Sequence, residues 1–409
     1  MPEQPLPVGS EFLINAAGGT DHRASTVVAE KSGGFLAAWI TAENVPVLHG
    51  RHFSVQGTPT GADMDLMDAP GGRAYQIYER PALVSRQNHG FQALWTGYFW
   101  TETGPGSYAS HEGMVTRQYL SDGTPATDYQ PAAVNFSGQQ GYAGLAETGF
   151  DNFVAVWSGN GTGDSVGVFQ RQFLSSGMPA GTESLVNTTT ANGQFQPRVA
   201  SRLGSGYVVV WRGYGPTDDQ GIFMRAFDAS GLPQGGEVRV NSTTTGTQDT
   251  PDIAMAENGR FVVVWHGYGS SGNSVVYAQR FDRNHLPVGD EIEVSSEASD
   301  SQFAPVVAMM PDGGFVVASH GSGPGDSTGV FLRRFDEFGD GQATLARVNS
   351  TLADSQRRAG IAVAPGGEIM VTWDGNGVAG SFQAYGQVYA RPMRVFRGGF
   401  EPTDGPCPY

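Results

Sequence analysis

Residues 207–211 read YVVVW, and 54 residues further on the chain reads FVVVW at 261–265. Apolar runs of this kind recur along the whole chain and end in one column: Trp39, Trp95, Trp157, Trp211, Trp265, Ser319 and Trp373. The last four intervals in this tryptophan column are 54 residues each, and the first two are 56 and 62. A constant period of this length indicates a repeat architecture with one unit for each member of the column.

Further columns keep the same register. Seventeen residues before the tryptophan column lies a glutamine column: His22, Tyr78, Gln140, Gln194, Gln248, Gln302 and Gln356. Twenty-four residues before it lies an asparagine column: Asn15, Asn187, Asn241, Ser295 and Asn349. An aromatic strand follows the tryptophan and ends at Phe173, Phe227, Phe281, Phe335 and Tyr389. We interpret the aromatic columns as fillers between repeats and the glutamines as braces for turns.

Each repeat contains four strand-like runs separated by Gly, Asn, Asp and Pro. In the fifth repeat they are PDIAMA, FVVVW, VVYAQRFD and EIEVS. Four antiparallel strands per unit, seven units and no helical periodicity predict an all-β, seven-bladed β-propeller of four-stranded antiparallel blades. One such unit cannot bury both of its faces, so neighbouring units must stack and the circle must close.

The two ends of the chain are complementary. The segment 11–15 matches the outermost strand of a repeat, and the last repeat stops near Pro392 without an outer strand of its own. We therefore expect the N-terminal strand to complete the last blade. This divides the chain into a single propeller over residues 1–393 and a C-terminal tail over 394–409.

Composition restricts the partners. The formal net charge is −16, lysine is nearly absent, and Gly accounts for 59 of 409 residues. An acidic chain of this kind is a poor match for nucleic acid, which needs a basic face. No apolar run approaches the length of a membrane span. The single cysteine, Cys407, excludes an intrachain disulfide. The first residues, MPEQPLPVGSEFLIN, contain no signal peptide, which leaves a cytosolic protein or one whose signal peptide has been removed.

Glycine-rich loops follow the tryptophan column, for example SGNGTGDS, RGYGPTDD and HGSGPGDS. We interpret them as hairpin turns between the second and third strands, because no helix follows that could offer its N-terminus to a phosphate. We expect no cofactor. Calcium is the alternative that these loops suggest, and its candidate ligands are Asp164, Asp218, Asp219 and Asp326. Arginines in the aromatic strand are expected to pair with aspartates: Arg171, Arg225, Arg333 and Arg334.

Functional residues are expected where aligned repeats differ in chemistry. A propeller places its two–three and four–one connections on one face around the channel, called the mouth face below. The position after the tryptophan column holds Ile40, Thr96, Ser158, Arg212, His266, His320 and Asp374. The position fifteen before it holds Ala24, Arg80, Tyr142, Gln196, Thr250, Ala304 and Arg358. Together with His22 and Tyr78, these residues form a polar, titratable ring.

Several interpretations of this ring stay open. Arg212, His266, His320 and Asp374 suit ligand binding, and His266 and His320 with Asp374 could instead hold a metal ion. A polysaccharide lyase would use a histidine and a tyrosine as base and acid, with an arginine neutralising a uronate carboxylate. The candidates for that chemistry are His22, Tyr78, Arg80, Tyr142, His266, His320 and Arg358. The plainest alternative is that these are solvated rim residues without a special role.

The second repeat carries an insertion, TGYFWTETGPGSYASHEG, between its second and third strands. Its aromatic and histidine residues are too numerous for core filling in one extended hairpin. The ligand-binding candidates on it are Tyr98, Trp100, Tyr108 and His111. Stacking on a sugar or covering the channel is the function that this loop suggests, and packing on a neighbouring loop is the alternative.

The repeat pattern VVVW…GIFxRxFDxxGxPxGxExxVN…QxxPxIA resembles repeats of secreted and surface proteins of bacteria. The resemblance is clearest from Val186 to Arg391, and the tail VFRGGFEPTDGPCPY is similar to short endings of exported proteobacterial proteins. It implies a propeller in a secreted, periplasmic or cell-surface protein. We therefore expect a monomeric, lectin-like propeller that binds a glycan through its mouth face. The alternatives are a polysaccharide lyase or hydrolase using the same face, and a structural adhesion module without a small ligand.

Overall fold

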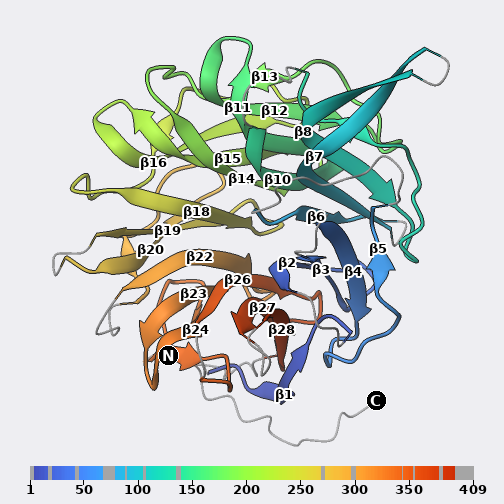
Figure 1. Ribbon diagram of the computed structural model, residues 1–409. Coiled ribbons are helices and arrows are strands. Elements are labelled where there is room, and N and C mark those ends of the chain that lie inside the picture. Colours follow the sequence, from blue (N-terminus) through green and yellow to red (C-terminus); the bar gives the residue numbers. More distant parts are fainter. Residues whose placement is uncertain are drawn as a thin grey trace, which may run out of the picture.

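A computed structural model describes residues 4–16, 21–41, 46–67, 79–87, 90–104, 107–134, 140–268, 272–295, 301–342, 344–352, 355–376 and 381–391. For residues 98–104 and 107–112 it describes the backbone only. The described residues form seven four-stranded antiparallel sheets and no helix, and the sheets are arranged around a central channel (Figure 1). Among these residues there is accordingly no helix with the length and apolarity that a membrane crossing requires.

The sheets follow one another in chain order, which confirms the seven-bladed propeller. The strands of blades 1 to 4, from the channel outward, are β2 (His22–Ala29), β3 (Phe35–Thr41), β4 (Val47–Phe53) and β5 (Met64–Asp65); β6 (Ala82–Ser85), β7 (Phe91–Gly104), β8 (Ser107–Tyr119) and β9 (Gln130–Pro131); β10 (Gln140–Gly149), β11 (Asn152–Gly161), β12 (Asp164–Phe173) and β13 (Ser184–Leu185); β14 (Gln194–Arg202), β15 (Gly206–Gly215), β16 (Asp218–Asp228) and β17 (Val238–Arg239). Those of blades 5 to 7 are β18 (Gln248–Met255), β19 (Phe261–Tyr268), β20 (Ser274–Phe281) and β21 (Ile292–Glu293); β22 (Gln302–Met309), β23 (Phe315–Gly323), β24 (Asp326–Phe335) and β25 (Ala346–Arg347); β26 (Gln356–Val363), β27 (Ile369–Asn376), β28 (Phe382–Tyr389) and β1 (Pro7–Leu13).

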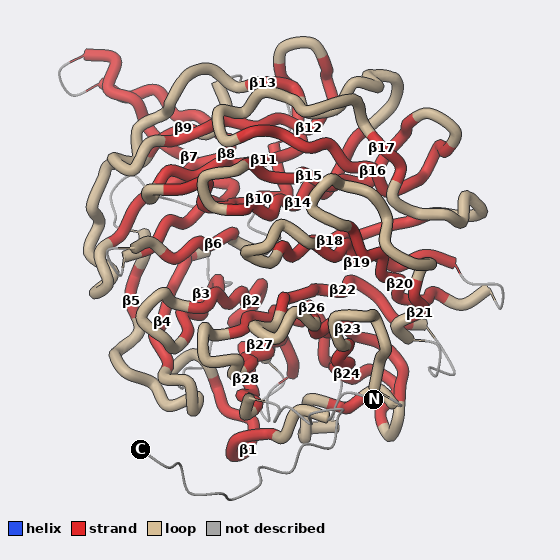
Figure 2. Tube along the Cα trace, turned by 180° about the vertical axis from the view of Figure 1, so that it is seen from behind, coloured by secondary structure: helices blue, strands red, loops and turns tan. Residues whose placement is uncertain are grey.

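The N-terminal strand completes blade 7, as the sequence predicts. β1 lies beside β28 (Figure 2). The two strands pair antiparallel, with Pro7 opposite Tyr389. The strand begins and ends earlier than the predicted segment 11–15. The carboxylate of Glu11 also accepts a 2.6 Å hydrogen bond from the backbone N–H of Ser350. Glu237 and Glu291 accept equivalent bonds in earlier blades, so β1 replaces an outer strand in its contacts as well as in its place.

The hydrophobic core lies between adjacent blades. One cluster, for example, joins Val210 of blade 4 to Trp265 of blade 5. All six tryptophans of the column are buried, and several stack on an aromatic residue of the next strand, such as Trp211 on Phe223 at 6.4 Å between ring centroids. Burying one such side chain contributes roughly 2–3 kcal/mol. This confirms the tryptophans as fillers between blades.

The glutamine column braces the tryptophan column. The indole Nε1–H of Trp211 donates to Gln194 Oε1 at 3.1 Å, and Trp265 and Trp373 donate to their own glutamines at 3.0 Å. In blade 6 the hydroxyl of Ser319 donates to Gln302 Oε1 at 2.8 Å, so the brace persists where tryptophan is lost. A buried N–H or O–H needs such an acceptor, and these glutamines are therefore structural.

The asparagine column fastens the outer strands. Asn241 Oδ1 accepts the backbone N–H of Ile222 at 2.8 Å, while its Nδ2 donates to Asp218 Oδ2 at 2.8 Å and to the carbonyl of Thr243 at 2.7 Å. The same clasp joins Asn187 to Asp164 and Asn349 to Asp326. The asparagines hold the end of one strand against the hairpin of another.

The mid-blade arginines differ from expectation. Arg171, Arg225 and Arg333 donate to backbone carbonyls of the preceding blade, for example Arg225 to Val186 O at 2.8 Å. Arg334 forms the expected pair with an aspartate, Asp312. Carbonyls at the end of a short outer strand lack ladder partners, and a guanidinium with five N–H groups can satisfy them.

Candidate functional site

The two predicted ring positions face each other on the mouth face. The residue after the tryptophan column lies in the second strand of each blade. In every blade except the second it pairs with the start of the innermost strand or lies next to that pair, as His266 pairs with Asp249. Next to this pair every innermost strand except β6 carries a β-bulge. The fold therefore repeats one local geometry around the channel.

Each bulge places a residue other than glycine in the left-handed region. The φ values lie between 44° and 59°, a conformation that costs energy for L-residues. The residues are Ala24, Tyr142, Gln196, Thr250, Ala304 and Arg358. They form the predicted ring position fifteen before the tryptophan column, apart from Arg80. A strained conformation repeated at the channel mouth must be held by contacts from outside the strand.

Those contacts come from the preceding blade. The backbone N–H of Ala24 donates to Asp374 Oδ2 at 2.8 Å, that of Thr250 to Gln196 Oε1 at 3.0 Å, and that of Ala304 to His266 Nδ1 at 3.4 Å. The N–H of Tyr142 donates to Glu79. A side chain of one blade thus holds the bulge of the next, which couples the blades to one another.

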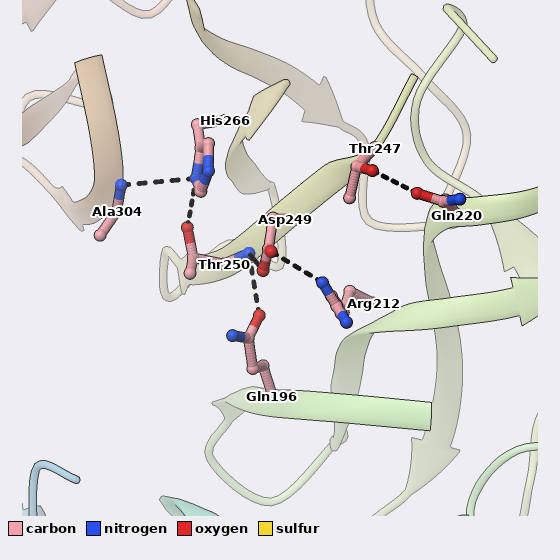
Figure 3. Close-up of polar contacts among 8 residues, drawn as sticks. All are labelled: Gln196, Arg212, Gln220, Thr247, Asp249, Thr250, His266 and Ala304. Carbon is pink, nitrogen blue, oxygen red and sulfur yellow. Dashed lines mark hydrogen bonds and ion pairs between the residues drawn. The ribbon is translucent and has the colours of Figure 1, made fainter. Parts of the chain in front are cut away.

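Blades 4, 5 and 6 are connected in this way (Figure 3). Arg212 forms an ion pair with Asp249 at 2.7 Å, and the hydroxyl of Thr250 lies 2.6 Å from His266 Nδ1. Because Ala304 N–H donates to Nδ1, the neutral imidazole carries its proton on Nε2. Burial lowers the pKa of His266, although the nearby charge of Asp249 acts in the opposite direction.

His320 breaks this pattern. It occupies in blade 6 the register position of His266 in blade 5, so the backbone of Arg358 would be its donor. Its Nδ1 is buried and has no hydrogen-bond partner among the described residues. Burial, together with the positive charges of Arg80, Arg357 and Arg358, lowers the pKa of His320 to about 3. His320 is therefore a neutral imidazole at pH 7, and its Nδ1 has no hydrogen-bond partner among the described residues.

A groove of about 480 Å³ lies beside His320, between blades 6 and 7, and its lining is rich in hydroxyl groups: Ser301, Phe303, His320, Gly321, Ser322, Ser327, Thr328, Ser355 and Gln356. Two blades earlier, at the same register positions, a pocket of only about 90 Å³ is lined by Gly193, Phe195, Arg212, Gly213, Tyr214, Asp219, Gln220, Thr247 and Gln248. The replacement of Tyr214, Arg212 and Gln220 by smaller residues accompanies the wider opening in blade 6.

The aromatic residue of the groove is accessible where its counterpart is covered. Arg212 lies over the ring of Phe195, 5.3 Å from its centroid, and forms the ion pair with Asp249. In blade 6, Phe303 is 40% exposed and has His266 and His320 as its ring neighbours. The groove between blades 6 and 7 thus combines an open aromatic ring, several hydroxyls and an imidazole.

The remaining ring candidates have structural contacts. Asp374 is fully buried and accepts bonds from Ala24 and Ser25, and Arg358 lies 3.8 Å from it. His22 is buried with its ring edge toward Trp39 at 6.5 Å. Burial, and next the charge of Glu79, raises the pKa of Tyr142. Tyr78 lies outside the described residues.

The insertion of the second repeat forms a long antiparallel ribbon, β7 and β8, in which Trp100 lies opposite Ser110 and Phe99 opposite His111. The side chains of Tyr98, Trp100, Tyr108 and His111 lie outside the described part of the chain, so their role stays a prediction. The aspartates proposed for calcium differ from one another: Asp164, Asp218 and Asp326 belong to the asparagine clasps, and Asp219 is exposed. Among the described residues no group of three or more His, Cys, Asp or Glu could hold a metal ion.

The sequence predicted His320 as a site residue but not the other groove residues, because most of these are serine, threonine or glycine, which are common in loops. The signal was present in the alignment of RGYGPTDD with HGSGPGDS, where tyrosine, threonine and aspartate give way to serine and glycine. It also missed Arg198 and Asp252, which line the channel.

Comparison with known proteins places the fold but no family. No protein-family model matches the sequence, and no curated protein matches it. The fold is similar to that of a protein of unknown function from Dyadobacter fermentans, with a TM-score of 0.52 and 10% identity over 93% of this chain and 97% of that one. It is also similar to the polysaccharide lyase Uly1, with a TM-score of 0.53 and 12% identity over 95% and 99%. A third similar structure is the NanB sialidase of Streptococcus pneumoniae, with a TM-score of 0.50 and 9% sequence identity over 94% of this chain and 71% of that one. The propeller fold is thus shared with carbohydrate-active enzymes.

Proposed function

We propose that this propeller binds carbohydrate in the groove between blades 6 and 7 of the mouth face. The observation that carries the proposal is the exposed ring of Phe303 beside hydroxyl groups and the imidazole of His320. A sugar ring presents C–H groups that pack on an aromatic face and hydroxyls that both donate and accept hydrogen bonds. Sites of this kind combine an apolar surface with a few polar groups that fix orientation.

His320 supplies a ring nitrogen, Nδ1, to which no described residue forms a hydrogen bond. A buried nitrogen without a partner costs about 1–3 kcal/mol, and a ligand hydroxyl would recover part of that cost if the ring turns so that Nδ1 faces the groove. Because the imidazole is neutral at pH 7, Nδ1 can accept a bond from a sugar O–H without a proton being lost first.

We also propose that the protein acts outside the cytoplasm, in the periplasm, at the cell surface or in the medium. The support is the resemblance of its repeats to those of secreted and surface proteins. Complex glycans are found in these places, which agrees with a glycan ligand.

A glycan array followed by calorimetric titration of the best ligand tests the proposal. We expect Phe303→Ala to weaken binding about tenfold or more, because stacking on an aromatic ring contributes roughly 1–3 kcal/mol. Phe195→Ala is the matched control at the same register position in blade 4, and it should leave binding unchanged. Equal affinities in wild type and Phe303→Ala would contradict the site, and an array without any ligand would favour the adhesion module instead.

Polysaccharide lysis is a second candidate, favoured by the neutral His320 in the positive field of Arg80 and Arg358. A lyase removes a proton next to a uronate carboxylate, and nearby cations stabilise the charge that develops. Incubation with uronate-containing polysaccharides would then produce unsaturated ends that absorb in the ultraviolet. Binding without such absorbance identifies a lectin, and loss of the absorbance in His320→Gln identifies the enzyme.

A further inference from the structure

The channel itself contains a second cavity, separate from the groove. Its volume is about 350 Å³, and residues of all seven innermost strands or the turns before them line it. Its charged lining residues are Glu79, Arg80, Arg198, Asp252 and Arg358. Such a concentration of charge inside a propeller is unusual, because ionised groups lose hydration there.

The three arginines have few partners among the residues that the structure describes. Arg80 has no hydrogen bond and no ion pair within 4 Å among them, although it lies within the fold. Within the same part of the chain, Arg198 donates only to the carbonyl of its neighbour Pro197, at 2.8 Å, and Arg358 has a single ion pair, with Asp374 at 3.8 Å. Each guanidinium carries five N–H donors, so most of the donors that the described residues direct at this cavity are unused.

The acidic residues nearby have other partners. Glu79 accepts the N–H of Tyr142, Asp252 accepts that of Val307 at 2.9 Å, and Asp374 accepts those of Ala24 and Ser25. These bonds hold neighbouring blades together. Burial raises the pKa of all three carboxyl groups, which disfavours their charged forms.

The arginines also repel one another. Burial lowers the pKa of Arg80 to about 10. The charge of Asp374 acts against this, and the charges of Arg198 and Arg358 lower the pKa further. Arg80 nevertheless stays protonated at pH 7. A half-buried cation that has no ion pair among the described residues and lies close to two other guanidinium groups is kept at a cost in stability unless an anion joins it.

We propose that the channel cavity is an oxyanion-binding site, in which Arg80, Arg198 and Arg358 hold a carboxylate or a sulfate group. Guanidinium groups bind both anions through paired N–H···O bonds. The site does not depend on carbohydrate binding in the groove between blades 6 and 7, because none of its lining residues belongs to that groove; the lyase candidate shares Arg80 and Arg358 with it. The anion can be a free ion or the acidic group of a uronic acid or sulfated sugar.

The test is calorimetric titration of the whole chain with sodium sulfate and with sodium glucuronate, at constant ionic strength, with glucose as the neutral control. We expect saturable binding of at least one anion and none of glucose. Tighter binding of glucuronate than of sulfate identifies an acidic sugar as the ligand, and the reverse order identifies a free oxyanion. Failure of both anions to bind would overturn the proposal, whatever the glycan array shows.

Two substitutions separate a ligand-binding arginine from a structural one. Arg80→Met should weaken anion binding about ten- to a hundredfold, since a hydrogen bond to a charged group contributes roughly 1.5–3 kcal/mol. It should not lower the melting temperature of the free protein, because it removes an unpaired buried charge. Arg225→Met is the control: it loses two bonds to carbonyls, and should destabilise the protein without changing anion affinity.

If Arg80→Met does not fold, Arg198→Gln serves as the second variant, with the same expected loss of affinity. Unchanged affinity in a folded variant would show that the arginines do not hold the anion. Destabilisation of the anion-free protein by Arg80→Met to the same extent as by Arg225→Met would make Arg80 a structural residue and overturn the proposal.

Discussion

The carboxylate of Asp374 accepts a 2.8 Å hydrogen bond from the backbone N–H of Ala24, although 350 positions separate the two residues in the chain. Its other oxygen accepts bonds from the N–H and the hydroxyl of Ser25, at 3.1 and 2.9 Å. Asp374 lies in β27 of the last blade and Ala24 in β2 of the first. This side chain therefore helps to close the ring, in addition to the pairing of β1 with β28.

Replacement of Asp374 should open this contact. Asp374→Ala leaves buried donors without acceptors, and we expect the free energy of unfolding to fall by about 3 kcal/mol or more. Asp374→Asn keeps one acceptor oxygen and should cost less. Urea unfolding measures both, with Asp219→Ala as an exposed control that should change little. Equal stability of Asp374→Ala and wild type would show that the strand pairing alone closes the propeller.

The asparagine clasp can be tested by using a difference between the repeats. Asn241→Ala removes three hydrogen bonds and should destabilise the protein by roughly 2–4 kcal/mol. Asn241→Ser should be milder, because Ser295 at the same register position still accepts the N–H of Val276 at 2.9 Å. Thermal unfolding of the two variants should rank serine above alanine. The reverse order would mean that the hydrogen bond from the N–H of Ile222 does not account for the stabilisation by Asn241.

His320 should make the stability of the protein depend on pH. Its pKa is about 3 in the folded protein and 6.5 in the unfolded chain, so between these values the unfolded chain binds more protons. Stability should therefore fall as the pH decreases below 6.5. At about pH 5 the loss due to this residue is about 2 kcal/mol relative to pH 7.5. His320→Gln should lack that part of the acid sensitivity in urea unfolding. An NMR titration of His320 with a midpoint near its ordinary pKa would contradict the assignment.

The groove can be closed by a residue that the fold already tolerates. Ser322 occupies the position of Tyr214 in blade 4, so Ser322→Tyr should fill the groove without a loss of stability. We expect glycan affinity to fall about tenfold or more while the melting temperature stays within a few degrees. Tyr214→Ser is the reciprocal control and should not affect binding in blade 6. Unaltered affinity in Ser322→Tyr would place the ligand elsewhere.

Much of the architecture was predictable because repetition makes structural roles visible. A tryptophan that recurs at one position in six of seven units, with a glutamine seventeen residues before it in most of them, has to serve something common to every unit. The hydrogen bond from the indole N–H of Trp211 to Gln194 is the reason why the two columns occur together. The closure of blade 7 by the N-terminal strand was predictable because the last repeat has no outer strand of its own. The exact bounds of the N-terminal strand were not predictable.

The candidate site was only partly predictable. The sequence placed His266 and His320 at the same register position on the mouth face, so the two histidines were expected to be equivalent. They differ because Nδ1 of His266 accepts the N–H of Ala304 and Nδ1 of His320 has no partner among the described residues, a difference that depends on atomic distances across blades. A sequence pattern does not encode such distances.

The sequence by itself therefore determined the seven-bladed propeller, its closure and the aromatic packing between blades. These features depend on periodicity and on burial, and residues that recur at one position of every repeat indicate both. Only the tertiary structure decided which interface stays open and which charges stay unpaired. The groove of Phe303 and His320 and the three arginines of the channel arise where side chains of different repeats meet, and there small differences in size and partner leave space, an unused acceptor and unused donors.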